Sequence, residues 1–333
     1  MKKRLILHIG QPKSATTSIQ SFLKNNRGAL LEQGVLYPES GLQYQAHHCL
    51  GTFFSGGPVD WIKPLDPDAV KAALLAEIGA VDCHTVVMSS ESLFYPRVDP
   101  ALARRYFAEF DVRVFMTLRR QDEWLESALR DNIKTGHVNG TDHLARAATL
   151  VSSVDYEAQI NKWVPVFGDD SMILTTFEPG GNREPVEQRF LDSIGAVFQP
   201  EMHVEPTQND RLNRDCLEYV GLLRARRRIS AKYFTFFGIL AEYSKQHKDP
   251  EEYRYVLPPD FRAGVMADNA QKNARIARKY FNRDDGVLFR QEPDAQQAPW
   301  APYPGLSRAA AVRIGEYLAD QLYRQLEACQ AIA

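Results

Sequence analysis

Four short apolar runs in the first half of the chain alternate with longer amphipathic segments. The runs are RLILHI (4–9), TVVMSS (85–90), VRVFMTL (112–118) and SMILTTF (171–177). Each run has the length and the β-branched or large apolar residues of a buried strand. Nearly continuous apolar strands separated by helices are typical of a parallel sheet that helices cover on both faces. The pattern therefore predicts a three-layer α/β/α fold.

Helical periodicity replaces the strand pattern after the fourth run. It is found in segments 184–195, 214–228, 231–246, 259–281 and 308–329. The strands alone cannot supply a second core, so we expect a single domain over 1–333. Within it we expect an α/β core over 1–200 and a mainly helical C-terminal extension over 201–333.

Composition and charge narrow the class of protein. Hydrophobic residues make up 44% and charged residues 25%, as in an ordinary globular protein. The formal net charge of −2 gives no reason to expect nucleic acid as a partner, so any anion site must be local. No apolar run approaches the roughly 20 residues of a membrane span. Four scattered cysteines (Cys49, Cys83, Cys216 and Cys329) are typical of buried thiols in a reducing compartment, so we expect a cytoplasmic protein.

The segment LHIGQPKSATTSIQSFL (7–23) has the features of an anion-binding loop. It follows the first predicted strand, and the apolar spacing after it predicts a helix over about 16–33. A helix N-terminus offers free N–H groups and a partial positive charge to a phosphate. Lys13 would add a full charge. Hydroxyl donors would come from Ser14, Thr16, Thr17 and Ser18. The alternative is an ordinary strand–turn–helix with Ser and Thr caps.

The residue spacing of this loop distinguishes between two classes of nucleotide-binding enzyme. A Walker P-loop has the spacing GxxxxGK[ST], whereas here Lys13 comes three residues after Gly10 and no glycine directly precedes it. That spacing disfavours a kinase or NTPase. The stretch HIGQPKSATTSIQSFL, followed by GVLYPES, instead resembles the P-K-[ST]-[GA]-T-T loop of the sulfotransferase family, and its bacterial members in particular. Those enzymes take a sulfuryl group from 3′-phosphoadenosine-5′-phosphosulfate (PAPS) and have a P-loop-like fold.

The resemblance implies that the loop holds the 5′-phosphosulfate of PAPS. The residues concerned are Lys13, Ser14, Ala15, Thr16, Thr17 and Ser18. Ala15 stands where many relatives have glycine. Its methyl group is tolerable if the backbone there is already helical.

A family member also needs a second anion site, for the 3′-phosphate of PAPS. The family pattern is an arginine at a strand end and a serine eight positions later, and Arg119 and Ser127 have that separation. The planar guanidinium fork of arginine suits phosphate, and ligands bind at the carboxyl ends of parallel strands. Arg120 is an alternative ligand. The helix carrying Ser127 should begin near Gln121 and bury Trp124, Leu125, Ala128, Leu129 and Ile133.

The base of the reaction should lie at the end of another central strand, and Glu91 follows the TVVMSS run. In the cytosolic branch of the family a Lys-Thr-His triplet at a similar strand end supplies a histidine base, and other branches use glutamate. The resemblance therefore implies Glu91 as the base and Lys13 as the group that stabilises the leaving phosphate. Ser89 departs from the lysine of the triplet. A carboxylate that merely stabilises a helix N-terminus is the alternative for Glu91.

His48, with its neighbour His47, is the second candidate for the base because histidine has a suitable pKa. Both lie in the long segment 39–67, rich in glycine, proline and aromatic residues, which we expect to shape the acceptor pocket. Its aromatic residues include Tyr44, Phe53, Phe54 and Trp61. Paired histidines on a loop are more often surface or packing residues. No cluster has metal-ligand spacing, and sulfuryl transfer requires no metal.

The sequence thus predicts a PAPS-dependent sulfotransferase that acts on a hydroxyl or amine of a small molecule or glycan and releases adenosine 3′,5′-bisphosphate. The alternatives are a P-loop-type kinase or NTPase and a non-catalytic nucleotide- or glycan-binding relative. Two weaker features stay open. The basic run 224–228 would meet an anionic acceptor or form a solvated helix face, and Glu178 would bind the acceptor or cap the next helix. Acceptor identity and oligomeric state cannot be read from the sequence.

Overall fold

A computed structural model of the chain describes residues 2–57, 61–135, 143–178, 184–205, 211–226, 233–290 and 299–330. The chain forms two compact units, each assembled from three separate segments. The first unit comprises 1–120, 155–207 and 269–291, and the second comprises 121–154, 208–268 and 292–333. The expected division into 1–200 and 201–333 stays a prediction beside these units.

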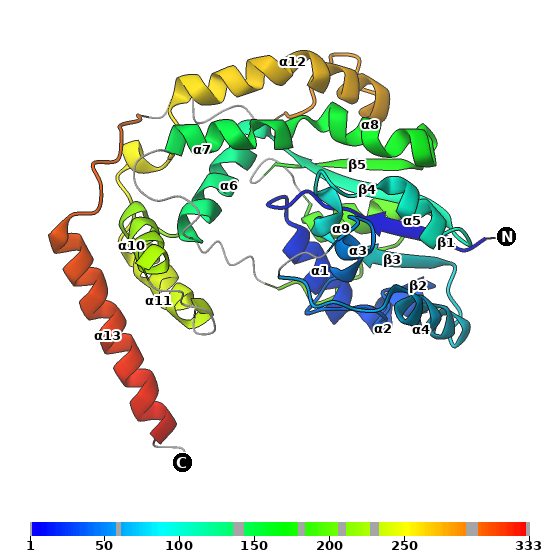
Figure 1. The fold of residues 1–333 in the computed structure, drawn as a ribbon, viewed down its shortest axis with the longest axis horizontal. Helices are drawn as coiled ribbons and strands as arrows, with labels where there is room; N and C mark the ends of the chain where they lie inside the picture. The colour runs from blue at the N-terminus through cyan, green and yellow to red at the C-terminus, as the bar shows by residue number, and fades with distance from the viewer. Residues whose placement is uncertain are drawn as a thin grey trace. The chain divides into compact units, whose positions relative to one another are not determined.

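The first unit contains a five-stranded parallel sheet in the order β2-β3-β1-β4-β5 (Figure 1). The strands are β1 (Arg4–His8), β2 (Val35–Leu36), β3 (Thr85–Ser89), β4 (Asp111–Arg119) and β5 (Met172–Phe177). The four predicted apolar runs form β1, β3, β4 and β5. The sequence did not reveal β2, because two residues are too short to show a period. The predicted α/β fold with a parallel sheet is confirmed.

Helices cover both faces of this sheet. They are α1 (Thr16–Asn25), α2 (Arg27–Glu32), α3 (Cys49–Phe53), α4 (Pro67–Gly79), α5 (Pro100–Tyr106), α8 (Tyr156–Phe167) and α9 (Val186–Ile194). On one face Ile6 and Val87 of neighbouring strands pack in a cluster with Phe22 of α1 and Phe190 of α9. The alternate strand residues, which point to the other face of the sheet, are also buried. On that face α8 packs against β4 and α5. Because the side chains on both faces of the sheet are buried, the four runs are apolar throughout.

The helix predicted over 16–33 is in fact two helices, α1 and α2, separated at Asn26. The side-chain amide of Asn26 donates to the carbonyl oxygens of Phe22 and His203, both at 2.8 Å, and its Oδ1 accepts from the His203 N–H at 2.7 Å. An asparagine side chain that bonds the backbone offers an alternative to the helical ladder. The break depends on a contact with a residue far along the chain, so local periodicity could not reveal it.

The last segment of the first unit is attached to the segment around α8 and β5. Lys272 and Arg275 of α12 (Pro259–Phe281) form salt bridges to Asp155 at 2.7 Å and Glu157 at 2.6 Å. Beyond β5, Glu178 is buried; its Oε2 accepts from the Arg290 N–H at 2.7 Å, and Thr176 Oγ1 donates to Oε1 at 3.1 Å. The first unit is therefore completed by chain that arrives about 90 residues after β5.

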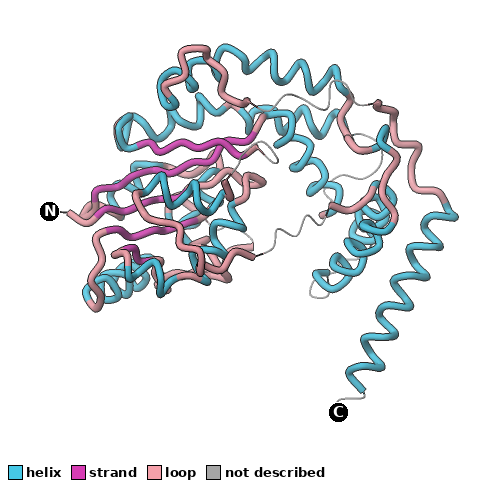
Figure 2. Tube along the Cα trace, turned by 180° about the vertical axis from the view of Figure 1, so that it is seen from behind, coloured by secondary structure: helices cyan, strands magenta, loops and turns pink. Residues whose placement is uncertain are grey.

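The second unit is helical, and every described strand belongs to the first unit (Figure 2). Its helices are α6 (Gln121–Lys134), α7 (His143–Leu150), α10 (Arg214–Arg226), α11 (Tyr233–Gln246), the first part of α12, and α13 (Arg308–Gln330). The apolar stripe predicted on α6 is buried, as expected. α10 packs closely against α6, because a Cβ on Gly221 would lie 2.9 Å from the Ile133 carbonyl oxygen.

The remaining structural expectations concern cysteines and membrane helices. Cys49, Cys83 and Cys216 are buried and free, and the side chain of Cys329 lies outside the described residues. Within the described part of the chain, no helix combines the length and the apolar character needed to cross a membrane.

Candidate active site

The loop between β1 and α1 turns through residues with left-handed backbone conformations. The φ angles are 69° at Gly10, 67° at Lys13 and 61° at Ala15. A Cβ on Gly10 would lie 2.8 Å from Thr16 Cγ2 and 3.1 Å from Glu91 Cβ, so both the backbone and the space favour glycine there. The loop therefore starts directly against Glu91, two residues after the end of β3.

The backbone condition set for Ala15 is not met. Its φ of 61° and ψ of 23° place it in the left-handed region, at the N-cap of α1, and not in a right-handed helical conformation. The left-handed conformation costs an L-residue about 1–2 kcal/mol relative to the right-handed one, whereas glycine is largely free of this cost. Ala15 therefore occupies a position that favours glycine, and the loop stores strain there.

The predicted loop donors differ in their exposure. Ser14 is buried, and its Oγ donates to Gln11 Oε1 at 3.2 Å, while its N–H donates to the Gln11 carbonyl oxygen at 3.2 Å. Thr16 is also buried, Lys13 and Ser18 are partly exposed, and Thr17 is exposed. The two hydrogen bonds from Ser14 to Gln11 close the turn 11–14. The roles of these donors toward a phosphosulfate stay predictions.

Arg119, at the end of β4, meets this loop. Its Nη1 donates to the carbonyl oxygen of Lys13 at 2.9 Å, and its guanidinium lies 5.6 Å from the ring centre of Phe177. β1 lies between β3 and β4, so the ends of all three strands reach the same edge of the sheet. Arg119 and Lys13, chosen from separate stretches of sequence, are therefore neighbours.

Ser127 and Arg120 are the other residues predicted for the 3′-phosphate. Ser127 lies on α6, in the second unit, and is partly exposed. Arg120 is buried. The role of Ser127 toward a 3′-phosphate stays a prediction from its spacing to Arg119, and Arg120 stays an alternative ligand.

Glu91 follows β3 as the first residue of a 3₁₀ helix, Glu91–Phe94. Its Oε2 accepts a hydrogen bond at 2.7 Å from Nε2 of Gln20, on α1. The same nitrogen donates to Ser89 Oγ at 3.2 Å, and Ser89 Oγ lies 2.8 Å from Nδ1 of His8. His8, Gln20 and Ser89 are buried, whereas Glu91 is partly exposed. A buried amide thus orients the Glu91 carboxylate while the carboxylate keeps access to solvent.

The sequence interpretation did not include the His8–Ser89–Gln20 network behind Glu91. A signal was present: His8 interrupts an apolar strand, and Gln20 stands among the buried residues of α1. Buried polar side chains are nearly always hydrogen-bonded, so two of them in neighbouring elements are candidates for a shared network. Burial lowers the pKa of His8 to about 3, so its ring is neutral at physiological pH.

His47 has both ring nitrogens engaged by the backbone. Nε2 lies 3.1 Å from the Pro38 carbonyl oxygen, which can only accept, so Nε2 carries the proton. Nδ1 accepts from the Ser89 N–H at 3.2 Å. Burial lowers the pKa of His47 to about 4. These contacts favour a structural role, in which His47 ties the segment 39–67 to the end of β3.

His48 lies closer to the candidate chemistry. Its Nδ1 is 3.3 Å from Ser90 Oγ, and its ring meets the Trp61 ring edge to face at 4.8 Å between centres. Burial lowers the pKa of His48, and the nearby Glu91 carboxylate opposes that shift. His48 therefore stays a candidate beside Glu91, as a group that exchanges a proton or faces the acceptor.

The aromatic residues of segment 39–67 separate into packing and exposed ones. Phe53 and Phe54 contact the Tyr106 ring, with centres 5.7 and 5.5 Å apart, and Phe54 is buried. Trp61 is half exposed and Tyr44 is 86% exposed. Of these four aromatic residues, Trp61 is the one whose ring contacts His48. Residues 58–60 lie outside the described residues.

Two predictions were left open by the sequence, on Glu178 and on the basic run 224–228. The Glu178 carboxylate is buried and bonded to Arg290 and Thr176, and α9 begins after Pro185 without a side-chain cap, so Glu178 does not cap that helix. Of the basic run 224–228, residues 227 and 228 lie outside the described residues. Among the described residues, no group of three or more His, Cys, Asp or Glu side chains is arranged to hold a metal ion.

Comparison with known proteins finds several similar solved structures, two of which are sulfotransferases of low identity. No family model matches the chain, and no curated protein matches it. A sulfotransferase from Alicyclobacillus acidocaldarius shares 14% identity, with 68% of this chain and 94% of that chain covered and a TM-score of 0.39. The sulfotransferase domain from the curacin biosynthetic pathway shares 15% identity, with 80% and 96% covered and a TM-score of 0.37. At this level of similarity, donor and acceptor must be argued from this chain's own residues.

Proposed function

We propose that this protein is a sulfotransferase that moves the sulfuryl group of PAPS to a hydroxyl or amine of an acceptor such as a carbohydrate. The observation that carries the proposal is the meeting of Lys13 and Arg119, joined by the 2.9 Å hydrogen bond, beside Glu91 at the carboxyl edge of the sheet. A cationic loop, a strand-end arginine and an oriented carboxylate are the parts that a group transfer between oxygens requires.

In the proposed site the loop from Lys13 to Ser18 binds the 5′-phosphosulfate. Arg119 binds the 3′-phosphate. The positive Lys13 side chain and the N-terminus of α1 attract the anion. PAPS is the co-substrate and brings the reacting sulfuryl group to the site.

The transfer itself forms one bond and breaks one. The acceptor oxygen or nitrogen attacks sulfur as the bond between sulfur and the bridging phosphate oxygen breaks. Lys13 stabilises the negative charge that develops on that oxygen, and Glu91 accepts the proton that the acceptor loses. The products are the sulfated acceptor and adenosine 3′,5′-bisphosphate. Gln20 holds the Glu91 carboxylate in place during the proton transfer.

Calorimetric titration with adenosine 3′,5′-bisphosphate, beside ATP and GTP, tests the donor. We expect the bisphosphate to bind and the Lys13→Ala variant to bind it at least tenfold more weakly, which corresponds to about 1.4 kcal/mol. Lys24→Ala is the matched control, because Lys24 is an exposed lysine of α1 whose ammonium donates to the Tyr44 carbonyl oxygen. Tight binding of ATP without binding of the bisphosphate would instead indicate a kinase or NTPase.

A further inference from the structure

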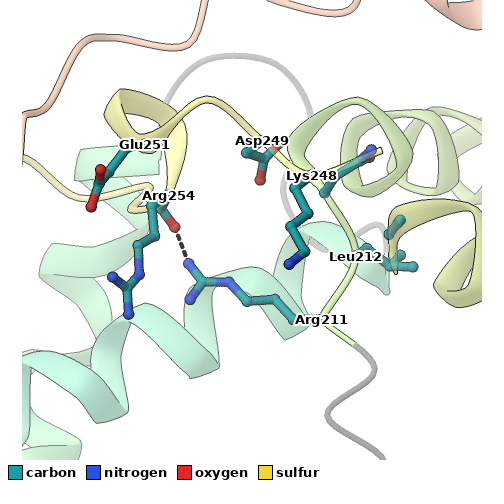
Figure 3. Close-up of a pocket in the computed structure, with 8 residues that line it drawn as sticks. Arg211, Leu212, Lys248, Asp249, Glu251 and Arg254 are labelled. Carbon is teal, nitrogen blue, oxygen red and sulfur yellow. Dashed lines mark hydrogen bonds between the residues drawn. The ribbon is translucent and has the colours of Figure 1, made fainter. Parts of the chain in front are cut away.

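A pocket of about 350 Å³ lies in the second unit, where the start of α10 meets the end of α11 and the turn Glu251–Tyr253 (Figure 3). We call it the basic pocket, after Arg211, Lys248 and Arg254, which line it. Its volume is at the lower end of the range for small-molecule sites, about 300–1,000 Å³. It is enough for one charged group with a small organic substituent.

The three cations of the basic pocket differ in their salt-bridge partners from three arginines elsewhere in the second unit. Arg130, Arg214 and Arg262 each form a salt bridge with a nearby carboxylate. No salt bridge joins Arg211, Lys248 or Arg254 to a carboxylate within the described ranges. Arg211 instead donates to the Arg254 carbonyl oxygen, a neutral acceptor that fixes its position (Figure 3), and its guanidinium lies 5.7 Å from the centre of the Tyr255 ring.

One carboxylate of the pocket, Asp249, interacts with several cations at once: burial raises its pKa, and the charges of Arg130, Arg211 and Arg214 oppose that shift. Asp249 Oδ1 accepts from the Arg214 N–H at 2.7 Å, and therefore caps the first turn of α10. Glu251 is the first residue of its own 3₁₀ turn and is exposed. Helix N-termini favour a negative charge, so part of the favourable interaction of the Asp249 charge is with the N-terminus of α10.

Arg130, whose charge is offset by the Glu126 carboxylate at 3.3 Å, anchors the wall of the pocket. Arg130 donates from Nη1 to the Leu212 carbonyl oxygen at 3.1 Å and from Nη2 to the Arg254 carbonyl oxygen at 2.9 Å. Burial lowers the pKa of Arg130 to about 10, and the neighbouring Arg211 charge acts in the same direction. Arg130 thus stays charged at physiological pH and holds the backbone that forms the pocket wall.

We propose that the basic pocket binds a tetrahedral oxyanion with two negative charges, as carried by a phosphate monoester or by inorganic sulfate. Guanidinium forks donate paired hydrogen bonds to such oxygens, and an ammonium adds a third cation. An anion between the three heads would relieve their mutual repulsion. The proposal is independent of the donor site in the first unit, and it assigns the second unit a ligand of its own.

The experiment is a titration of inorganic phosphate into the Lys13→Ala protein at pH 8 and low salt, followed by amide NMR and calorimetry. The Lys13→Ala background removes the loop cation of the first unit. We expect saturable shifts around Leu212–Arg214 and Lys248–Arg254. Adding Lys248→Gln or Arg254→Gln should weaken binding about tenfold each, as the loss of one charge-assisted contact predicts. Sulfate should compete with phosphate, and acetate should bind much more weakly.

The control is Lys245→Gln, which removes an exposed lysine of the same helix end that pairs with Glu242. Equal weakening by Lys245→Gln would mean a diffuse field rather than a site, and would overturn the proposal. Absence of saturable shifts at the pocket, or acetate binding as tightly as phosphate, would overturn it as well. Lys248 is exposed, so loss of binding in Lys248→Gln cannot be attributed to loss of folding.

Discussion

At the scale of single residues, Glu91 combines access to solvent with a fixed orientation, and both properties suit a base. The alternative, a carboxylate at a helix N-terminus, describes the same residue, since Glu91 also begins a 3₁₀ helix. The two interpretations differ in what removal of the charge does. A base contributes to the rate, whereas a helix-terminal charge contributes only to stability, by about 0.3–1 kcal/mol.

Glu91→Gln is therefore expected to lower the rate of sulfuryl transfer by at least about 100-fold, the usual contribution of a general base. Binding of adenosine 3′,5′-bisphosphate should be nearly unchanged, because the base faces the acceptor. A labelled-PAPS assay over an acceptor panel measures the rate. Glu109→Gln, which removes an exposed carboxylate paired with Lys71, is the control. Unchanged turnover in Glu91→Gln would assign the proton transfer to another group, with His48 next.

Ala15→Gly is expected to stabilise the protein. Glycine removes the cost of the left-handed conformation, about 1–2 kcal/mol, and loses part of that gain, about 0.4–1 kcal/mol, to the greater freedom of the unfolded chain. The net gain should be about 0.5–1 kcal/mol, measured by urea denaturation. A loss of stability would contradict the left-handed assignment. Ala29→Gly in α2 is the control and should destabilise by about 1 kcal/mol.

The buried histidines predict a dependence of stability on pH. The folded pKa values of His8 and His47 are about 3 and about 4, below the ordinary value of 6.5. Between these values the unfolded chain binds more protons than the folded protein, so stability falls as the pH falls from 6.5 toward 4. The loss for each is on the order of 3 kcal/mol. Urea denaturation across this range measures it, and a flat profile would contradict it.

At the scale of elements, the sequence was most informative where the apolar period is long. The four long strands and the α6 stripe lie where the pattern predicted them. β2 was missed because it has two residues, and the break at Asn26 was missed because His203 causes it. For the candidate active site, the positions of the predicted strand ends indicated which residues would lie at the same edge of the sheet. The Gln20 network needed the three-dimensional pairing of α1 with β3.

The contact between α6 and α10 gives a prediction at this scale. Gly221→Ala should destabilise by about 1–3 kcal/mol through overpacking, because the new Cβ would lie 2.9 Å from a backbone oxygen that cannot easily yield. Gly238→Ala in α11 is the matched control. Nothing lies within 4 Å of its added Cβ, so the better helix propensity of alanine should stabilise by up to about 1 kcal/mol. Equal effects of the two substitutions on the free energy of unfolding would contradict the close packing.

At the scale of the whole molecule, a donor site in the first unit predicts uneven stabilisation by ligand. At a bisphosphate concentration of 100 Kd, linkage adds about 2.7 kcal/mol to the state that binds. Amide hydrogen exchange should slow in the loop 7–23 and at the ends of β1, β3 and β4. The peptides of α13 should change little. Uniform slowing throughout both units, or none in the loop, would contradict the proposed site.

The interleaved segments of the first unit have a consequence for the newly made chain. The Lys272 and Arg275 salt bridges and the Arg290 amide that binds Glu178 all come from the segment 269–291. While the ribosome is still extending the chain past β5, the Glu178 carboxylate lacks its amide partner from Arg290. The unit that carries the proposed donor loop therefore becomes complete only after the segment 269–291 has been made. Release of an early fragment would leave a sheet exposed to aggregation, and such a nascent chain is a natural client for chaperones.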